Sequence, residues 1–188
     1  EGVLGVTSPR SLKMTQPYFG DHRQFRDVFK HELAHQFMIQ KVRTVARKSN
    51  ALGNPLEAFP LWFIEGSAEY YNKGGVDPET DALIRDIVLN SNPRRGYALP
   101  DFYSDRPRGY LTTYKFGQLR CAFLDDVYGE GTIRRIMEES PRLVGTEENP
   151  RALGRFSKLI QELTGDDKRR VSDRFDAWLK DRVYDVYL

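Results

Sequence analysis

Apolar residues recur every three or four positions along most of the chain, which predicts a mostly helical protein. The longest such segment covers residues 21–48. It contains no Gly or Pro, and Asp21 is suited to cap a helix at its start. Two apolar stripes run along this segment, one through Phe25, Phe29, Leu33 and Phe37 and the other through Val28, His31, His35, Met38 and Val42. Two stripes predict a helix that packs on more than one side, near the centre of the domain.

Gly, Pro and Asn divide the rest of the chain into shorter elements. Loops are predicted at residues 49–59 and 91–109. Helices are predicted at residues 60–72, 78–90, 111–128, 132–139, 151–163 and 168–187, and the apolar stripe of the last is typical of a helix that packs on a core. Two apolar runs before the long helix, at residues 3–7 and 12–15, predict short strands or a hairpin. The predicted fold class is therefore α+β and mostly α.

The composition excludes several classes of protein. A chain of 188 residues that is 39% hydrophobic and 30% charged suits one globular domain. The formal net charge of +2 argues against a nucleic-acid-binding surface. No apolar run approaches the roughly 20 residues that a membrane span needs. The single cysteine, Cys121, excludes an internal disulfide, and its apolar neighbours predict a small buried thiol.

The strongest chemical signal is His31-Glu32-Leu33-Ala34-His35, an H-E-x-x-H motif inside the long predicted helix. A step of four residues advances a helix by about 6 Å and returns to nearly the same face, so both imidazoles can bind one ion. Glu32 lies one step around the helix, where it can reach a water on that ion without being a ligand. We therefore predict that His31 and His35 are metal ligands. The remaining histidine, His22, is predicted to be a surface residue near the helix start.

A catalytic zinc site needs a third protein ligand and one open position. Glu65 is the candidate, because it lies in the next predicted helix among apolar residues, where a carboxylate needs an arginine or a metal as counter-charge. Gly66 beside it weakens a helix by about 1 kcal/mol relative to alanine, which indicates the close approach of another backbone. One turn further on, Glu69 is placed to accept a hydrogen bond from the far nitrogen of His31. Its alternative role is that of a solvated or ion-paired glutamate.

The sequence HELAH at residues 31–35, followed by EGSAEY at residues 65–70, resembles the gluzincin zinc metallopeptidases, in which a glutamate is the third ligand. The chain is most similar to the small bacterial peptidase MA-like domains, distant relatives of thermolysin and the aminopeptidase N family. Weaker similarity extends through TYKFG at residues 113–117, Tyr-Gly at 128–129 and Leu-Thr-Gly at 163–165, so it covers most of the chain from about Phe25 onward.

The resemblance implies a single zincin-like catalytic domain over residues 1–188. It would have short strands at 1–20, metal-binding helices at 21–90 and a helical C-terminal part at 110–188. The implied roles are zinc ligation by His31, His35 and Glu65, activation of a zinc-bound water by Glu32, and support of a ligating histidine by Glu69. The resemblance also implies that Tyr114 stabilises the oxyanion. Tyr110 is the competing tyrosine, and a packing role stays open for both.

The predicted function is hydrolysis of peptide bonds in a peptide or protein substrate, without a nucleic-acid partner or a membrane span. The chain has no Gly-x-Met-Glu-Asn segment of the aminopeptidase type, so endo- and exopeptidase action both stay open. The alternative is a non-catalytic zinc-containing domain of the same fold, with a binding or structural role. A structural zinc usually has four protein ligands, and no convincing fourth ligand is found. The resemblance favours a secreted or periplasmic bacterial protein.

Overall fold

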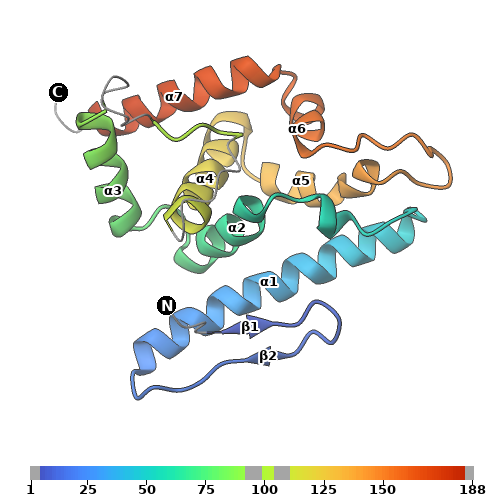
Figure 1. Ribbon diagram of the computed structural model, residues 1–188, viewed down its shortest axis with the longest axis horizontal. Helices are drawn as coiled ribbons and strands as arrows, with labels where there is room; N and C mark the ends of the chain where they lie inside the picture. The colour runs from blue at the N-terminus through green and yellow to red at the C-terminus, as the bar shows by residue number, and fades with distance from the viewer. Residues whose placement is uncertain (1–4, 92–98, 104–110, 185–188) are drawn as a thin grey trace.

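The computed structural model describes residues 5–91, 99–103 and 111–184. They form a mostly helical fold with one small antiparallel hairpin, which confirms the predicted fold class (Figure 1). The strands and helices are β1 Val6–Thr7, β2 Met14–Thr15, α1 His22–Lys48, α2 Leu61–Lys73, α3 Pro78–Leu89, α4 Phe116–Tyr128, α5 Thr132–Glu138, α6 Phe156–Thr164 and α7 Lys168–Tyr184. Short 3-10 turns cover Pro55–Ala58 and Ser140–Leu143, and a π-helical turn, Leu111–Lys115, precedes α4.

The helix α1 is the longest element, and its sequence sets its start. The Asp21 side chain accepts hydrogen bonds from the backbone N–H groups of Arg23, at 2.8 Å, and Gln24, at 3.1 Å. These bonds satisfy donors that the first turn of a helix leaves unpaired. The helix then continues to Lys48, as the absence of Gly and Pro predicts. Figure 1 shows the hairpin along one side of α1 and α2 along another.

The hairpin is fixed to α1 by side-chain hydrogen bonds to the backbone. Its paired residues are Val6 with Thr15 and Thr7 with Met14, which confirms the predicted hairpin. The Thr7 hydroxyl donates to the backbone carbonyl of Glu32 at 3.1 Å, and Gln36 Nε2 donates to the carbonyl of Leu12 at 2.8 Å. The hairpin therefore forms a wall beside the H-E-x-x-H turn of α1.

The helices α2 and α4 cross in the middle of the fold through two glycines. A Cβ on Gly66 of α2 would lie 2.5 Å from the Cα of Gly117 in α4, closer than any real contact. This confirms the close approach predicted at Gly66. Pro60 precedes α2, and Gly74 ends it in the left-handed conformation, with φ of 71°.

An aromatic core joins α2, α4 and α7. The rings of Phe102, Phe123 and Phe175 contact one another edge to face, with centroids 5.1 to 5.6 Å apart, and Trp62 packs on Phe102 at 5.5 Å. The helix α7 buries the stripe Val171, Phe175, Leu179 and Val183. The stripe therefore packs on the core, as predicted; Val186, which would extend it, lies outside the described residues.

Some local predictions are wrong. Residues 151–155 are not helical, because the N–H groups of Leu153 and Gly154 bond to the carbonyls of Arg142 and Leu143 instead. Residues 111–115 form a π-helical turn rather than the first turn of an α-helix. The predicted loop at 49–59 contains a 3-10 turn, and most of the predicted loop at 91–109 lies outside the described residues.

The two stripes of α1 have different surroundings. Met38 and Val42 are buried, in agreement with packing of the second stripe. Phe29 and Phe37 are 41% and 62% exposed, so the first stripe is not buried along its length. The hairpin and α2 cover the other sides of this helix, and they leave these two rings at the surface. None of the helices in the described parts of the chain is long and apolar enough to cross a membrane.

Candidate metal centre

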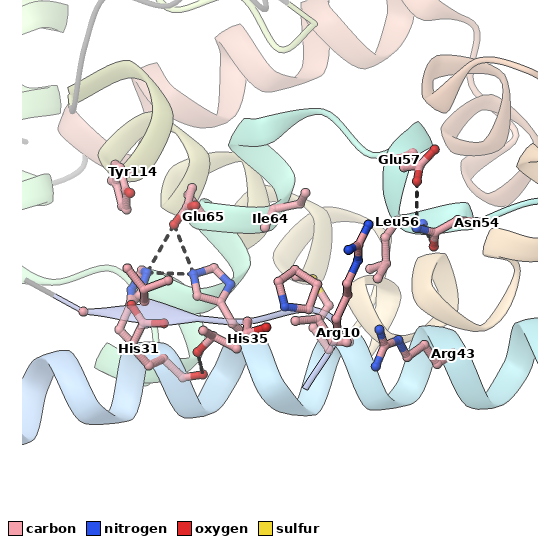
Figure 2. Close-up of a pocket in the computed structure, with 18 residues that line it drawn as sticks. Arg10, His31, His35, Arg43, Asn54, Leu56, Glu57, Ile64, Glu65 and Tyr114 are labelled. Carbon is pink, nitrogen blue, oxygen red and sulfur yellow. Dashed lines mark hydrogen bonds and ion pairs between the residues drawn. The ribbon is translucent and has the colours of Figure 1, made fainter. Parts of the chain in front are cut away.

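Three side chains from two helices converge on one point. His31 and His35 project from the same face of α1, and Glu65 projects toward them from α2 (Figure 2). Glu65 Oε2 lies 3.2 Å from Nε2 of His31 and 3.1 Å from Nε2 of His35. The two Nε2 atoms are 3.0 Å apart. One atom from each residue therefore faces a common centre, and the three residues form a group that could hold a metal ion.

The spacing and chemistry of these donors fit a tetrahedral cation. Ligand atoms of a tetrahedral zinc with bonds of 2.0–2.1 Å are separated by about 3.3 Å, close to the spacing found here. Hydrogen bonds satisfy this triangle poorly. If both Nε2 atoms carry protons for Glu65, two N–H donors lie side by side with their nitrogen atoms only 3.0 Å apart. A cation in the middle gives all three lone pairs a partner. The residues present therefore fit a bound divalent metal.

The electrostatics of Glu65 suit the same role. Burial by itself raises the pKa of this carboxyl group, but the hydrogen bonds and charges of His31 and His35 outweigh it and lower the pKa to about 2. Glu65 is therefore an anion at neutral pH, about 3 Å from both imidazoles. A mostly buried carboxylate that stays ionised provides negative charge for a cation.

Glu32 lies between the histidine face of α1 and the hairpin. Its side chain is 6% exposed and lines the same cleft as the three candidate ligands. Gly5 lies against it, and a Cβ on Gly5 would come 3.0 Å from Glu32 Oε1. Glu32 Oε2 is buried and has no hydrogen-bond partner among the described residues. As a carboxylate in the lining of the cleft, Glu32 is suited to accept a proton from a water there.

Glu69 lies behind His31, one turn after Glu65 on α2. Its Oε1 atom is 3.8 Å from His31 Nδ1, the nitrogen that faces away from the candidate metal position. This distance is too long for a hydrogen bond, although the approach is to the predicted atom. Its Oε2 atom is buried without a hydrogen-bond partner in the described part of the chain. The predicted support of His31 by Glu69 therefore remains a prediction.

Tyr114 belongs to the π-helical turn before α4. Its ring centroid lies 5.8 Å from that of His31, and the side chain lines the cleft on the side of Glu65 (Figure 2). Its position agrees with the role that the resemblance implies. Tyr110, the competing tyrosine, lies outside the described residues. His22 is exposed and does not line this cleft, as expected, and Cys121 is fully buried, where burial raises the pKa of its thiol.

The cleft around these groups has a volume of about 770 Å³ and extends well beyond the metal centre. The hairpin, α1, α2 and the turn Pro55–Ala58 provide its walls. The far part of the cleft is lined by residues that no sequence motif marks, among them Arg10, Arg43, Asn54 and Glu57. Helical periodicity could have placed Arg43 here, because it lies two four-residue steps after His35 and therefore on the same face of α1. The other three depend on how the loops fold onto α1, for which the sequence offered no pattern.

The chain is similar to one known family over part of its length. Residues 24–76 match the family model described as M61 glycyl aminopeptidase, a metallopeptidase family. The matched segment contains α2 and nearly all of α1, the two helices that carry His31, His35 and Glu65. No curated protein and no solved structure is similar enough to count as a match. The family match supports a peptidase.

Proposed function

We propose that this chain is a zinc-dependent peptidase, in which His31, His35 and Glu65 hold the metal and Glu32 is the general base. The observation that carries the proposal is the triangle of donor atoms, with sides of 3.0 to 3.2 Å, contributed by two separate helices. The partial match to a peptidase family over these helices supports the peptidase part of the proposal. We further propose that residues 1–188 act as one gluzincin-like domain.

When bound, zinc supplies a Lewis acid that polarises a peptide carbonyl and lowers the pKa of a water toward about 7. Glu32 accepts the proton of the attacking water with its unpartnered Oε2 atom and delivers this proton to the leaving amine. The hairpin, which lines the cleft, holds the peptide, because β1 pairs with β2 alone among the described residues and its other edge can pair with an extended segment.

Two further residues have supporting roles in this proposal. Tyr114 donates a hydrogen bond from its hydroxyl to the oxyanion that develops on the attacked carbonyl. Glu69 orients His31 through Nδ1 and keeps its Nε2 atom aimed at the metal. We also propose a gluzincin relationship, which is supported by the position of Glu65, the proposed third ligand, on the α-helix that follows the H-E-x-x-H helix.

The test combines metal analysis with peptide cleavage. The zinc content of the purified chain should be one ion per molecule, and a library of quenched peptides should be cleaved in a reaction that a chelator stops and zinc restores. Glu32→Gln should keep the zinc and lose most of the turnover. Peptides with free or blocked N-terminal glycine test the activity that the family description names.

The outcomes separate the proposal from its alternative. One zinc ion per chain without cleavage of any peptide would favour a binding or structural domain. Absence of stoichiometric metal would refute the metal centre itself. A fully active Glu32→Gln variant would remove Glu32 from the mechanism.

A further inference from the structure

The cleft continues past the metal centre to a second group of charged side chains. Figure 2 shows Arg10 and Arg43 at the end of the pocket away from Tyr114, with Glu57 and Asn54 above them. Both arginines line the same 770 Å³ cleft as His35 and Glu65. The cleft therefore has an acidic end at the metal centre and a basic group at the other end.

The position of Arg43 follows from the periodicity of α1. His35, Ile39 and Arg43 succeed one another at four-residue steps, and all three line the cleft. Eight residues of α-helix span about 12 Å along the axis. An extended peptide advances about 3.3 Å per residue, so this distance corresponds to three or four residues of bound substrate. Ile39, which is buried, forms the apolar floor between the two ends.

Arg10 approaches the same place from the hairpin turn. Both arginines are exposed, and neither has a hydrogen bond or ion pair with another described residue. Glu57, which lines the same part of the cleft in Figure 2, accepts a hydrogen bond from Asn54 Nδ2 at 3.1 Å and pairs with neither arginine. Both guanidinium groups line one cleft, and neither pairs with a described residue, so their donors are available to a ligand. A carboxylate matches these planar donors best, because it can accept two parallel hydrogen bonds.

We propose that Arg10 and Arg43 form a carboxylate-binding subsite of this cleft. It takes an acidic side chain or the C-terminal carboxylate of a peptide, about three or four residues from the bond at the metal centre. This inference names the substrate class of the cleft and rests on the proposed peptidase function.

Equilibrium binding tests the subsite without turnover. Fluorescent peptides are titrated against zinc-loaded Glu32→Gln protein in two matched arms. In one arm, Glu replaces Gln at successive positions of a peptide with an amidated C-terminus. In the other, a peptide without acidic side chains carries a free or amidated C-terminus. We expect the peptide with the extra carboxylate to bind about tenfold more tightly than its neutral counterpart in one of the two arms. The arm that shows this difference tells whether the subsite takes an acidic side chain or a C-terminal carboxylate.

Variants of the two arginines assign the preference. Arg43→Gln and Arg10→Gln should each reduce the ratio of affinities for acidic and neutral peptides, and the double variant should bring it close to one. Arg43→Glu should reverse the preference toward a peptide with Lys at that position. The control is Arg47→Gln, an exposed arginine one turn further along α1 that does not line the cleft; it should keep the full ratio.

Equal affinities in both arms, or a preference that survives the double variant, would overturn the subsite. Failure of the proposed hydrolysis gives a different result. Wild-type protein would then cleave no peptide, while the acid preference in binding and its dependence on Arg10 and Arg43 would persist and support the subsite.

Discussion

Gly66 of α2 lies directly against Gly117 of α4. A Cβ on Gly66 would sit 2.5 Å from the Cα of Gly117, and a Cβ on Gly117 would sit 2.5 Å from the carbonyl oxygen of Trp62. The two backbones touch where any side chain would separate them. Glu65 immediately precedes one glycine and Tyr114 lies one turn before the other, so the crossing places both residues on the same side of the cleft.

Gly66→Ala should therefore destabilise the fold and weaken metal binding together. The added methyl group overlaps backbone atoms that no rotamer change can move, so we expect the free energy of unfolding to fall by about 3 kcal/mol. Urea denaturation measures this change, and a chelator competition measures zinc affinity. Ser67→Ala is the matched control, because it introduces alanine at the next position of the same helix. It removes only a hydroxyl group, and loss of its hydrogen bond should lower the free energy of unfolding by about 1 kcal/mol. If Gly66→Ala were as stable as this control, the crossing would not constrain α2.

The sequence predicted the features that depend on short-range spacing. The H-E-x-x-H step places His31 and His35 on one face of α1, and Asp21 and Gly74 mark where α1 begins and α2 ends. Glu65 was also identifiable, because a carboxylate among apolar helix residues needs a counter-charge. The structure brings these three side chains together, with donor atoms 3.0 to 3.2 Å apart.

The features that depend on tertiary packing were not predictable from the pattern. The apolar spacing of Phe29 and Phe37 suggested burial, but no periodicity says how many sides of α1 are covered. The π-helical turn that carries Tyr114 resembles an α-helical segment in its apolar pattern. Arg10 reaches the cleft because the hairpin folds back along α1, which depends on hydrogen bonds such as that from Gln36 to Leu12.

Zinc should stabilise the wild-type chain by mass action. At a free concentration 100 times the dissociation constant, bound metal raises the free energy of unfolding by about 2.7 kcal/mol, which corresponds to about 5–10 °C in Tm for a chain of this size. Differential scanning calorimetry with zinc and with a chelator measures the shift. Glu65→Gln should lose most of it, whereas His22→Gln, a histidine on the same helix outside the cleft, should retain it. An equal shift in all three proteins would mean that the metal binds elsewhere.

Glu69→Gln should weaken zinc binding without unfolding the chain. The carboxylate faces His31 Nδ1, the ring nitrogen that points away from the candidate metal position. In zinc proteins, loss of such a partner lowers metal affinity by roughly 10- to 100-fold. Competition with a chromophoric chelator gives the affinity, and circular dichroism verifies the fold. Glu130→Gln, at an exposed position after α4, should leave the affinity unchanged. If Glu69→Gln bound zinc as tightly as wild type, Glu69 would have no positioning role.

Tyr114→Phe should lower kcat and leave KM nearly unchanged. A hydroxyl that bonds only the developing oxyanion contributes to the transition state and not to substrate binding, and removal of one such donor costs on the order of 100-fold in kcat. Steady-state kinetics on the best library peptide separates the two constants. Tyr18→Phe, at an exposed ring before α1, is the control and should match wild type. A rise in KM at constant kcat would instead assign Tyr114 to substrate binding.

The buried ion pair between Asp77 and Lys115 should make stability fall in acid. Lys115 is 3% exposed, and its Nζ lies 3.1 Å from Asp77 Oδ2. Burial raises the pKa of Asp77, but hydrogen bonds from the Thr80 backbone N–H and from Lys115 outweigh it, so the net pKa is below its usual value. A lowered native pKa adds stability above the unfolded pKa, near 4, and this contribution is lost as the pH falls through the native value.

Asp77→Asn tests that contribution, because asparagine still caps α3 while the carboxylate charge of Asp77 disappears. The exposed carboxylate of Glu79, with Oε2 2.9 Å from Lys115 Nζ, stays in the variant. In the presence of chelator, we expect the free energy of unfolding at pH 7 to fall by about 1–3 kcal/mol relative to wild type. The difference should shrink below about pH 4, where protonation removes the same charge from the wild-type protein. Asp27→Asn removes the charge of a half-exposed pair with Lys73 at 3.3 Å and should cost less than about 1 kcal/mol. A difference between wild type and Asp77→Asn that stayed constant from pH 7 to pH 2 would show that the cost does not come from the ionised carboxylate.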